Sequence, residues 1–117
     1  PALADGACER GAETFKLKIK VRDNKPVEVT HRGSNAETLA VCPGDQIEWQ
    51  LINPASAPSF FVNFASSAPF RGESRRNASN GKILVTISDG LSAGASFKYD
   101  IGIDGGGVWD PVIIIDE

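Results

Sequence analysis

Apolar and polar residues alternate along several short segments of the chain. Over residues 15–22 every second residue is apolar and each of the others is cationic. Successive side chains of an extended strand point to opposite faces, so this pattern predicts a strand with one face on a core and the other in water. Residues 47–51, 82–88 and 97–101 alternate in the same way, and 112–115 is a continuous β-branched run typical of a strand buried on both faces.

Three further segments, 27–30, 38–41 and 60–64, complete a set of about seven to eight short strands. Turn sequences such as Asp23-Asn24-Lys25-Pro26 and Pro43-Gly44-Asp45 separate them. No helical periodicity stands out, so the pattern predicts an all-β sandwich or barrel. Trp49 alternates in phase with Ile47 and Leu51, and we expect it to be buried.

The chain has 117 residues, a length that fits one domain over 1–117. Within it we expect an irregular N-terminal segment over 1–13 and a long variable loop over 65–81. A net charge of −3 argues against a general nucleic-acid binder, because such a protein needs a basic face. No stretch of about 18 apolar residues is present, so we expect no membrane span.

Two parts of the chain resemble a known family of β-sandwich proteins. Residues 39–53, LAVCPGDQIEWQLIN, are similar to the family's strand, Pro-Gly-Asp turn and aromatic-bearing strand, and PSFFV follows at 58–62. The second part is FKYDI at 97–101, followed by a glycine-rich loop and a terminal strand. The resemblance implies a Greek-key β-sandwich of the cupredoxin, plastocyanin-like type.

The same resemblance implies that copper is not bound. The family's first His falls on Ser59, its Cys on Ile101, its second His on Asp104 and its Met on Trp109. A blue-copper centre needs two imidazoles and a thiolate. This chain has one histidine, His31, so we expect no copper and no other cofactor.

In the family, partners dock on the apolar rim around the metal-site loops. The matching positions define a candidate contact surface of Pro58, Ser59, Pro69, Asp104 and Trp109, beside the glycine loop 105–107. Two interpretations of Trp109 stay open. It either anchors a partner from an exposed position or folds inward and fills the space of the missing metal site.

Other candidate chemistry is sparse. Arg71, Arg75, Arg76 and Lys82 form a candidate anion patch, and several C-terminal aspartates, among them Asp100, Asp104, Asp110 and Asp116, leave a calcium site open as an alternative. No acid, base and nucleophile can be assembled, so we expect no enzyme.

Cys8 and Cys42 are the only cysteines, and either a disulfide or two free thiols fits the sequence. A bridge favours a periplasmic or secreted protein, and free thiols favour the cytoplasm.

Together these observations predict a copper-free binding or interaction module whose partner is a protein or a small ligand. Two alternatives remain. One is a structural domain of a larger assembly, and the other is an anion- or calcium-binding domain. An exposed apolar patch at the loop end would distinguish the binding module from a packed structural unit.

Overall fold

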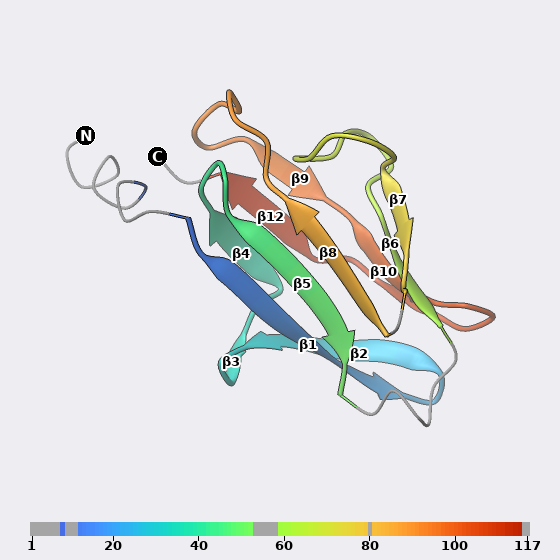
Figure 1. Cartoon of the computed structure of the whole chain (residues 1–117). Coiled ribbons are helices and arrows are strands. Elements are labelled where there is room, and N and C mark those ends of the chain that lie inside the picture. Colours follow the sequence, from blue (N-terminus) through green and yellow to red (C-terminus); the bar gives the residue numbers. More distant parts are fainter. Residues whose placement is uncertain (1–7, 9–11, 53–58, 80, 116–117) are drawn as a thin grey trace.

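A computed structural model describes residues 8, 12–52, 59–79 and 81–115 of the chain (Figure 1). These residues form twelve strands. The strands are β1 (Thr14–Arg22), β2 (Lys25–His31), β3 (Ser34–Asn35), β4 (Thr38–Val41), β5 (Gln46–Leu51), β6 (Phe60–Asn63), β7 (Arg75–Asn77), β8 (Lys82–Thr86), β9 (Ser96–Lys98), β10 (Asp100–Ile103), β11 (Val108–Trp109) and β12 (Val112–Ile115). Each segment expected to form a strand contains one, although 97–101 is divided between β9 and β10, and the extra strands are short.

The strands form two packed layers. One layer is a five-stranded sheet in the order β3-β2-β1-β5-β8, in which β1 pairs antiparallel with β2 and parallel with β5. The other layer combines a four-stranded sheet, β11-β10-β6-β7, with a three-stranded sheet, β4-β12-β9. The fold is therefore the β-sandwich that the alternating pattern predicted.

The core lies between the layers and follows the alternation. Strand β1 buries Phe15, Leu17 and Ile19 and exposes the lysines between them. Trp49 on β5 is fully buried, which confirms the expectation for this residue. Its indole Nε1–H donates a hydrogen bond of 3.2 Å to the hydroxyl of the buried Tyr99, so its polar atom is satisfied inside the core.

The expected strand over 97–101 is in fact two strands. β9 pairs with β12, whereas β10 pairs with β6, and the chain passes from one sheet to the other at Tyr99. The expected loop over 65–81 also differs from the structure, because residues 75–77 form β7 against β6. Both differences arise from pairing partners that are distant in sequence.

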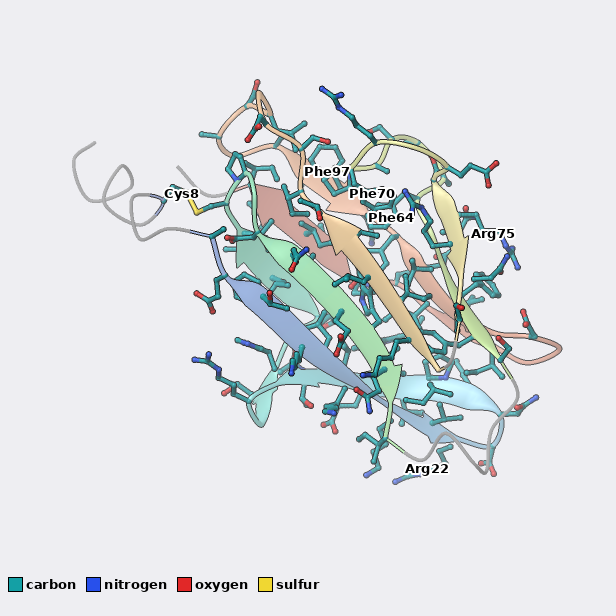
Figure 2. All side chains as sticks on the ribbon, viewed as in Figure 1. Cys8, Arg22, Phe64, Phe70, Arg75 and Phe97 are labelled. Carbon is teal, nitrogen blue, oxygen red and sulfur yellow. A yellow bond between two sulfur atoms is a disulfide. The ribbon has the colours of Figure 1, made fainter. Side chains whose placement is uncertain are left out.

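The Pro43-Gly44-Asp45 turn and a disulfide fix one end of the sandwich. The buried Asp45 carboxylate accepts hydrogen bonds from the backbone N–H groups of Cys42, at 2.8 Å, and Glu13, at 2.9 Å. Cys42 is bonded to Cys8, so the disulfide alternative is correct (Figure 2). Cys8 and Glu13 are thereby held to the core. No helix in the described part of the chain has the length and apolar character needed to cross a membrane.

Candidate functional site

The positions that match copper ligands form two pairs, one at the end of β10 and one along it. The backbone N–H of Asp104 donates to the carbonyl of Ser59 at 2.9 Å, just beyond the paired ends of β6 and β10. Ile101 on β10 is in register with Trp109 on β11. Pro58 lies outside the described residues.

The glycine loop closes this end of the sandwich. The N–H of Gly107 donates to the carbonyl of Asn24 at 3.0 Å, in the turn between β1 and β2. A Cβ on Gly106 would lie 2.1 Å from the same carbonyl oxygen, so only glycine permits this approach. The loop therefore packs against the hairpin turn, while Ser59, Asp104 and Val108 at this end stay exposed.

Trp109 and Pro69 do not form an exposed rim with Ser59 and Asp104. Trp109 is partly buried and packs against the core, which favours the space-filling interpretation over the anchoring one. Pro69 is buried, and its carbonyl accepts a 2.8 Å hydrogen bond from Ser88, beyond the other end of β6. The inclusion of Pro69 in the contact surface was wrong, because the 64–74 connection leaves β6 at the end opposite Ser59.

Comparison with known proteins supports the architecture. The structure is similar to a pseudoazurin from Sinorhizobium meliltoi, with a TM-score of 0.55 and 16% sequence identity over 90% of this chain and 75% of that chain. The chain has a cupredoxin-like fold. The reduced Cu(I) form of an amicyanin mutant is also similar, with a TM-score of 0.48 and 14% identity over 86% of this chain and 81% of that one. No protein-family model and no curated protein matches the sequence.

The residues of this cupredoxin-like domain do not fit the type 1 copper of the fold. Ile101 is fully buried in the core and has no ligand atom, and both cysteines are consumed by the disulfide. His31 lies in the other layer, where its ring is 5.0 Å from Phe15, and burial together with Arg32 lowers its pKa. Within the described ranges no three His, Cys, Asp or Glu side chains gather where a metal could bind.

The C-terminal aspartates separate into two places. Asp100 and Asp110 lie together, and the hydrogen bond that the protonated Asp100 carboxyl donates to the Asp110 side chain raises the pKa of Asp100. Asp104 lies elsewhere, 4.0 Å from the Arg75 guanidinium, and Asp116 is outside the described residues. These two carboxyl groups offer at most four of the six to eight oxygen ligands that calcium takes.

The basic cluster is also divided. Arg75 and Arg76 are neighbours on β7, so their side chains point to opposite faces of its sheet. Arg75 extends outward and covers the Phe61 ring, with its guanidinium carbon 3.8 Å from the ring centroid (Figure 2). Arg76 covers the buried Phe70 from the other side, at 4.9 Å. Lys82 lies on the neighbouring edge strand β8 and is exposed.

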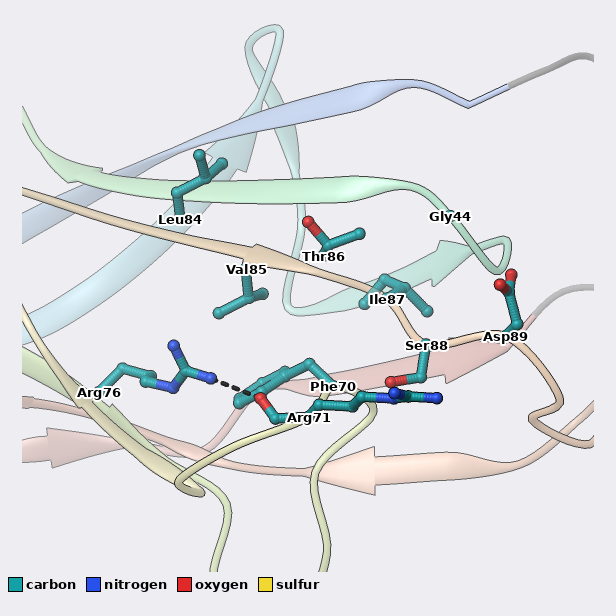
Figure 3. A pocket seen from close by; sticks show the side chains of 10 residues that line it. All are labelled: Gly44, Phe70, Arg71, Arg76, Leu84, Val85, Thr86, Ile87, Ser88 and Asp89. Atoms are coloured by element: carbon teal, nitrogen blue, oxygen red, sulfur yellow. Dashed lines mark hydrogen bonds between the residues drawn. The ribbon is translucent and has the colours of Figure 1, made fainter.

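Arg71 and Arg76 line a hollow of about 450 Å³ between β8 and the 69–76 segment (Figure 3). The wall formed by β8 contributes Leu84, Val85 and Thr86, and Asp89 lies at the rim. Leu84 is one of the few large apolar side chains that the described part of the chain exposes, at 51%. The site thus combines two cations, one carboxylate and an apolar wall.

Arg76 is held in place by its neighbours. Its Nε–H donates to the carbonyl of Glu73 at 2.9 Å, and an Nη2–H donates to the carbonyl of Arg71 at 2.7 Å. Beneath it, Phe70 meets Phe64 edge to face at 5.1 Å, and Phe64 stacks on Tyr99 at 4.7 Å. A row of aromatic rings therefore connects this guanidinium to the core.

The sequence pointed to the arginines of this hollow but not to its other wall. Leu84 had a detectable signal, because it is an apolar residue at an outward position of the alternating 82–88 strand. Phe70 had none, since it lies in a segment without periodicity. Its place under Arg76 depends on the pairing of β7 with β6.

Proposed function

We propose that this chain is a non-enzymatic, copper-free binding module that takes a carboxylate-bearing partner in the hollow beside β8. The observation that carries the proposal is the fixed guanidinium of Arg76, which lines an open hollow together with Arg71 and the apolar Val85 of β8. The end with Ser59 and Asp104 is a weaker candidate, because its glycine loop packs against the turn at Asn24 and Trp109 is partly buried against the core.

A carboxylate is the chemistry that suits this site. The planar guanidinium pairs with a carboxylate through two parallel N–H···O bonds, and such charged pairs are stronger than neutral hydrogen bonds. Two backbone carbonyls already orient Arg76, so little side-chain entropy is lost when a partner binds. With Asp89 at the rim, the two arginines leave a net positive charge.

Two further features support a binding role. No nucleophile, base and orienting group lie together at the described hollow, where the titratable residues are Arg71, Arg76 and Asp89. The Cys8–Cys42 disulfide favours a periplasmic or secreted protein, since such bonds persist in oxidising compartments. A binding domain in such a compartment can act through this surface alone, without catalysing a reaction.

The test is an NMR titration of ¹⁵N-labelled protein with N-acetyl-glutamate N-methylamide and, separately, with its glutamine counterpart. We expect the glutamate compound alone to shift the signals of Arg71, Arg76 and β8, with a weak affinity that falls as salt is added. Arg76→Gln should abolish these shifts. Arg75→Gln is the matched control on the opposite face of β7 and should leave them intact. Equal responses to both compounds would contradict the proposal.

A further inference from the structure

The edge of β8 beside the hollow carries unpaired backbone groups. β8 is the last strand of its sheet, and within the described residues it pairs only with β5. In an antiparallel pair, alternate residues direct their N–H and C=O groups to the partner strand and the others direct them away. One hydrogen bond between β8 and β5 is therefore enough to tell, for every residue of β8, whether its N–H and C=O groups point to β5 or away from it.

Bonds at both ends of β8 settle this direction. Ile87 bonds towards the β5 side, because its N–H donates to Asp45 at 2.7 Å and its carbonyl accepts from Gly44 at 2.9 Å. By alternation the backbone N–H and C=O groups of Ile83 and Val85 also point to β5. Those of Leu84 and Thr86 therefore point to the free edge. Lys82 and Ser88 share that direction, which their own bonds confirm.

The free edge is closed at its two ends and open between them. The N–H and the carbonyl of Lys82 both pair with Ser79, and the Ser88 N–H donates to the Pro69 carbonyl. Between these closures, no described backbone group bonds to Leu84 or Thr86 on this side. The six steps from Lys82 to Ser88 span about 20 Å of extended chain. The hollow lies along this opening.

We propose that the open edge of β8 binds an extended peptide segment of a partner protein as an added strand. Main-chain hydrogen bonds to Leu84 and Thr86 would supply affinity, and side chains that alternate between two faces would supply specificity. This proposal rests on the carboxylate site of the proposed function and names its ligand.

The two faces of β8 specify the sequence of that segment. An added strand would point one set of side chains inward, on the side of Val85, Phe70 and the two arginines (Figure 3). The other set would point outward beside the exposed Leu84. The segment that fits has an acidic residue facing inward, for Arg76, and a β-branched apolar residue on each side of it, facing outward.

A second copy of this chain fits the edge less well. The strand that it would offer, β8 itself, contains Lys82 and no acidic residue. Pairing two such edges would also bring two pairs of arginines towards one another. Like charges at close range oppose association, so charge complementarity selects an acidic segment of another protein.

The experiment uses the blocked peptide acetyl-Ser-Val-Glu-Val-Ser-amide and the same peptide with Gln in place of Glu. We expect the Glu peptide to bind at least about tenfold more tightly than the single-residue carboxylate. We also expect it to slow amide hydrogen exchange at Leu84 and Thr86 about tenfold or more. The Gln peptide should bind about tenfold more weakly, and Arg76→Gln should remove this difference.

Thr86→Pro is the matched variant for the backbone. It deletes an N–H on the free edge and leaves the bonds from Ile83, Val85 and Ile87 to the β5 side in place, and proline is tolerated on edge strands. We expect this variant to lose the tight binding of the peptide and to keep the weak binding of N-acetyl-glutamate N-methylamide. If the variant does not fold, the exchange rates of Leu84 and Thr86 in the unaltered protein decide the question.

Three results would overturn the inference. If the single carboxylate binds but the peptide binds no more tightly and protects neither amide, strand addition is wrong and the carboxylate site stands. If the Gln and Glu peptides bind equally and both protect the amides, the acidic specificity and the carboxylate site are wrong. If sedimentation shows a dimer in which Leu84 and Thr86 are protected without peptide, the occupant of the edge is a second copy.

Discussion

Single polar residues whose hydrogen bonds are formed inside the fold help to hold its segments together. Asp45 is a fully buried carboxylate with backbone N–H groups of Cys42 and Glu13 as donors. A buried polar group is tolerated only when such bonds replace those to water. Asp45 therefore connects the end of β4, the start of β5 and the segment before β1.

Replacing Asp45 with Ala should destabilise the protein. The change leaves two backbone N–H groups without their partner, each of which costs about 1–3 kcal/mol when buried, so the loss should be about 2–4 kcal/mol. Urea denaturation followed by circular dichroism measures it. Asp89→Ala removes an exposed aspartate and should change stability by less than about 0.5 kcal/mol. Equal, small effects would show that the carboxylate of Asp45 contributes nothing to the fold.

Trp109 should act as part of the core rather than as an anchor. Its side chain is partly buried against the core, so Trp109→Ala should cost about 2 kcal/mol, less than the ~3–5 kcal/mol of a fully buried aromatic residue. Binding of the acidic peptide should be unchanged, because the hollow lies beside β8. If Trp109→Ala kept full stability but lost peptide binding, the contact surface would lie at Trp109 and not beside β8.

At the scale of elements, the sequence predicted the strands better than their partners. The alternation over 15–22, 47–51 and 82–88 fixes which face of each strand is buried, and those faces are correct in the structure. The alternation over 97–101 does not reveal that the chain passes from one sheet to another at Tyr99, because apolar and polar residues keep alternating on both sides of this residue. Short strands such as β7 carry too few residues to show any period.

The glycine loop is an element whose role emerged only in the structure. Glycine adopts positive φ angles readily, and Gly105 has a φ of 77°. Gly106, however, is required for close packing, because the carbonyl of Asn24 occupies the place of its Cβ. That contact joins residues more than 80 positions apart, so no local pattern reveals it.

Gly106→Ala should separate the loop from the hairpin turn and destabilise the protein by about 1–3 kcal/mol, as overpacking does elsewhere. Thermal unfolding measures the loss. The Gly90→Ala variant is the control, because a Cβ there meets no atom within 4 Å and only the positive φ of 81° opposes it. Should Gly106→Ala be no more destabilising than Gly90→Ala, the contact with Asn24 does not support this end of the sandwich.

The whole molecule has a cupredoxin-like fold, and its described residues include no cluster of side chains that could hold a metal. The motifs were enough to predict this fold and to place Ser59, Ile101, Asp104 and Trp109 at the ligand positions, and a single histidine cannot supply two imidazoles. The hollow beside β8 could not be predicted. It is formed by β8 of one layer and the 69–76 segment of the other, and only the packing of the layers brings them together.

Copper(II) added at one equivalent per chain should produce no intense visible charge-transfer band and no stoichiometric tight binding. The reason is that no thiolate remains beside the disulfide and that the ligand positions are Ser59, Ile101, Asp104 and Trp109. Absorption spectroscopy and calorimetry measure the two properties. A blue protein with one copper per chain would contradict the assignment.

We propose that the binding surface of this sandwich lies beside β8 and not at the end with Ser59, Asp104 and Trp109. Chemical-shift mapping of the ¹⁵N-labelled protein with acetyl-Ser-Val-Glu-Val-Ser-amide distinguishes the two regions, because they lie on different elements. We expect the largest changes at Phe70, Arg76, Leu84 and Thr86, with Ser59 and Trp109 unaffected. Changes centred on Ser59, Asp104 and Trp109, with β8 unaffected, would contradict it.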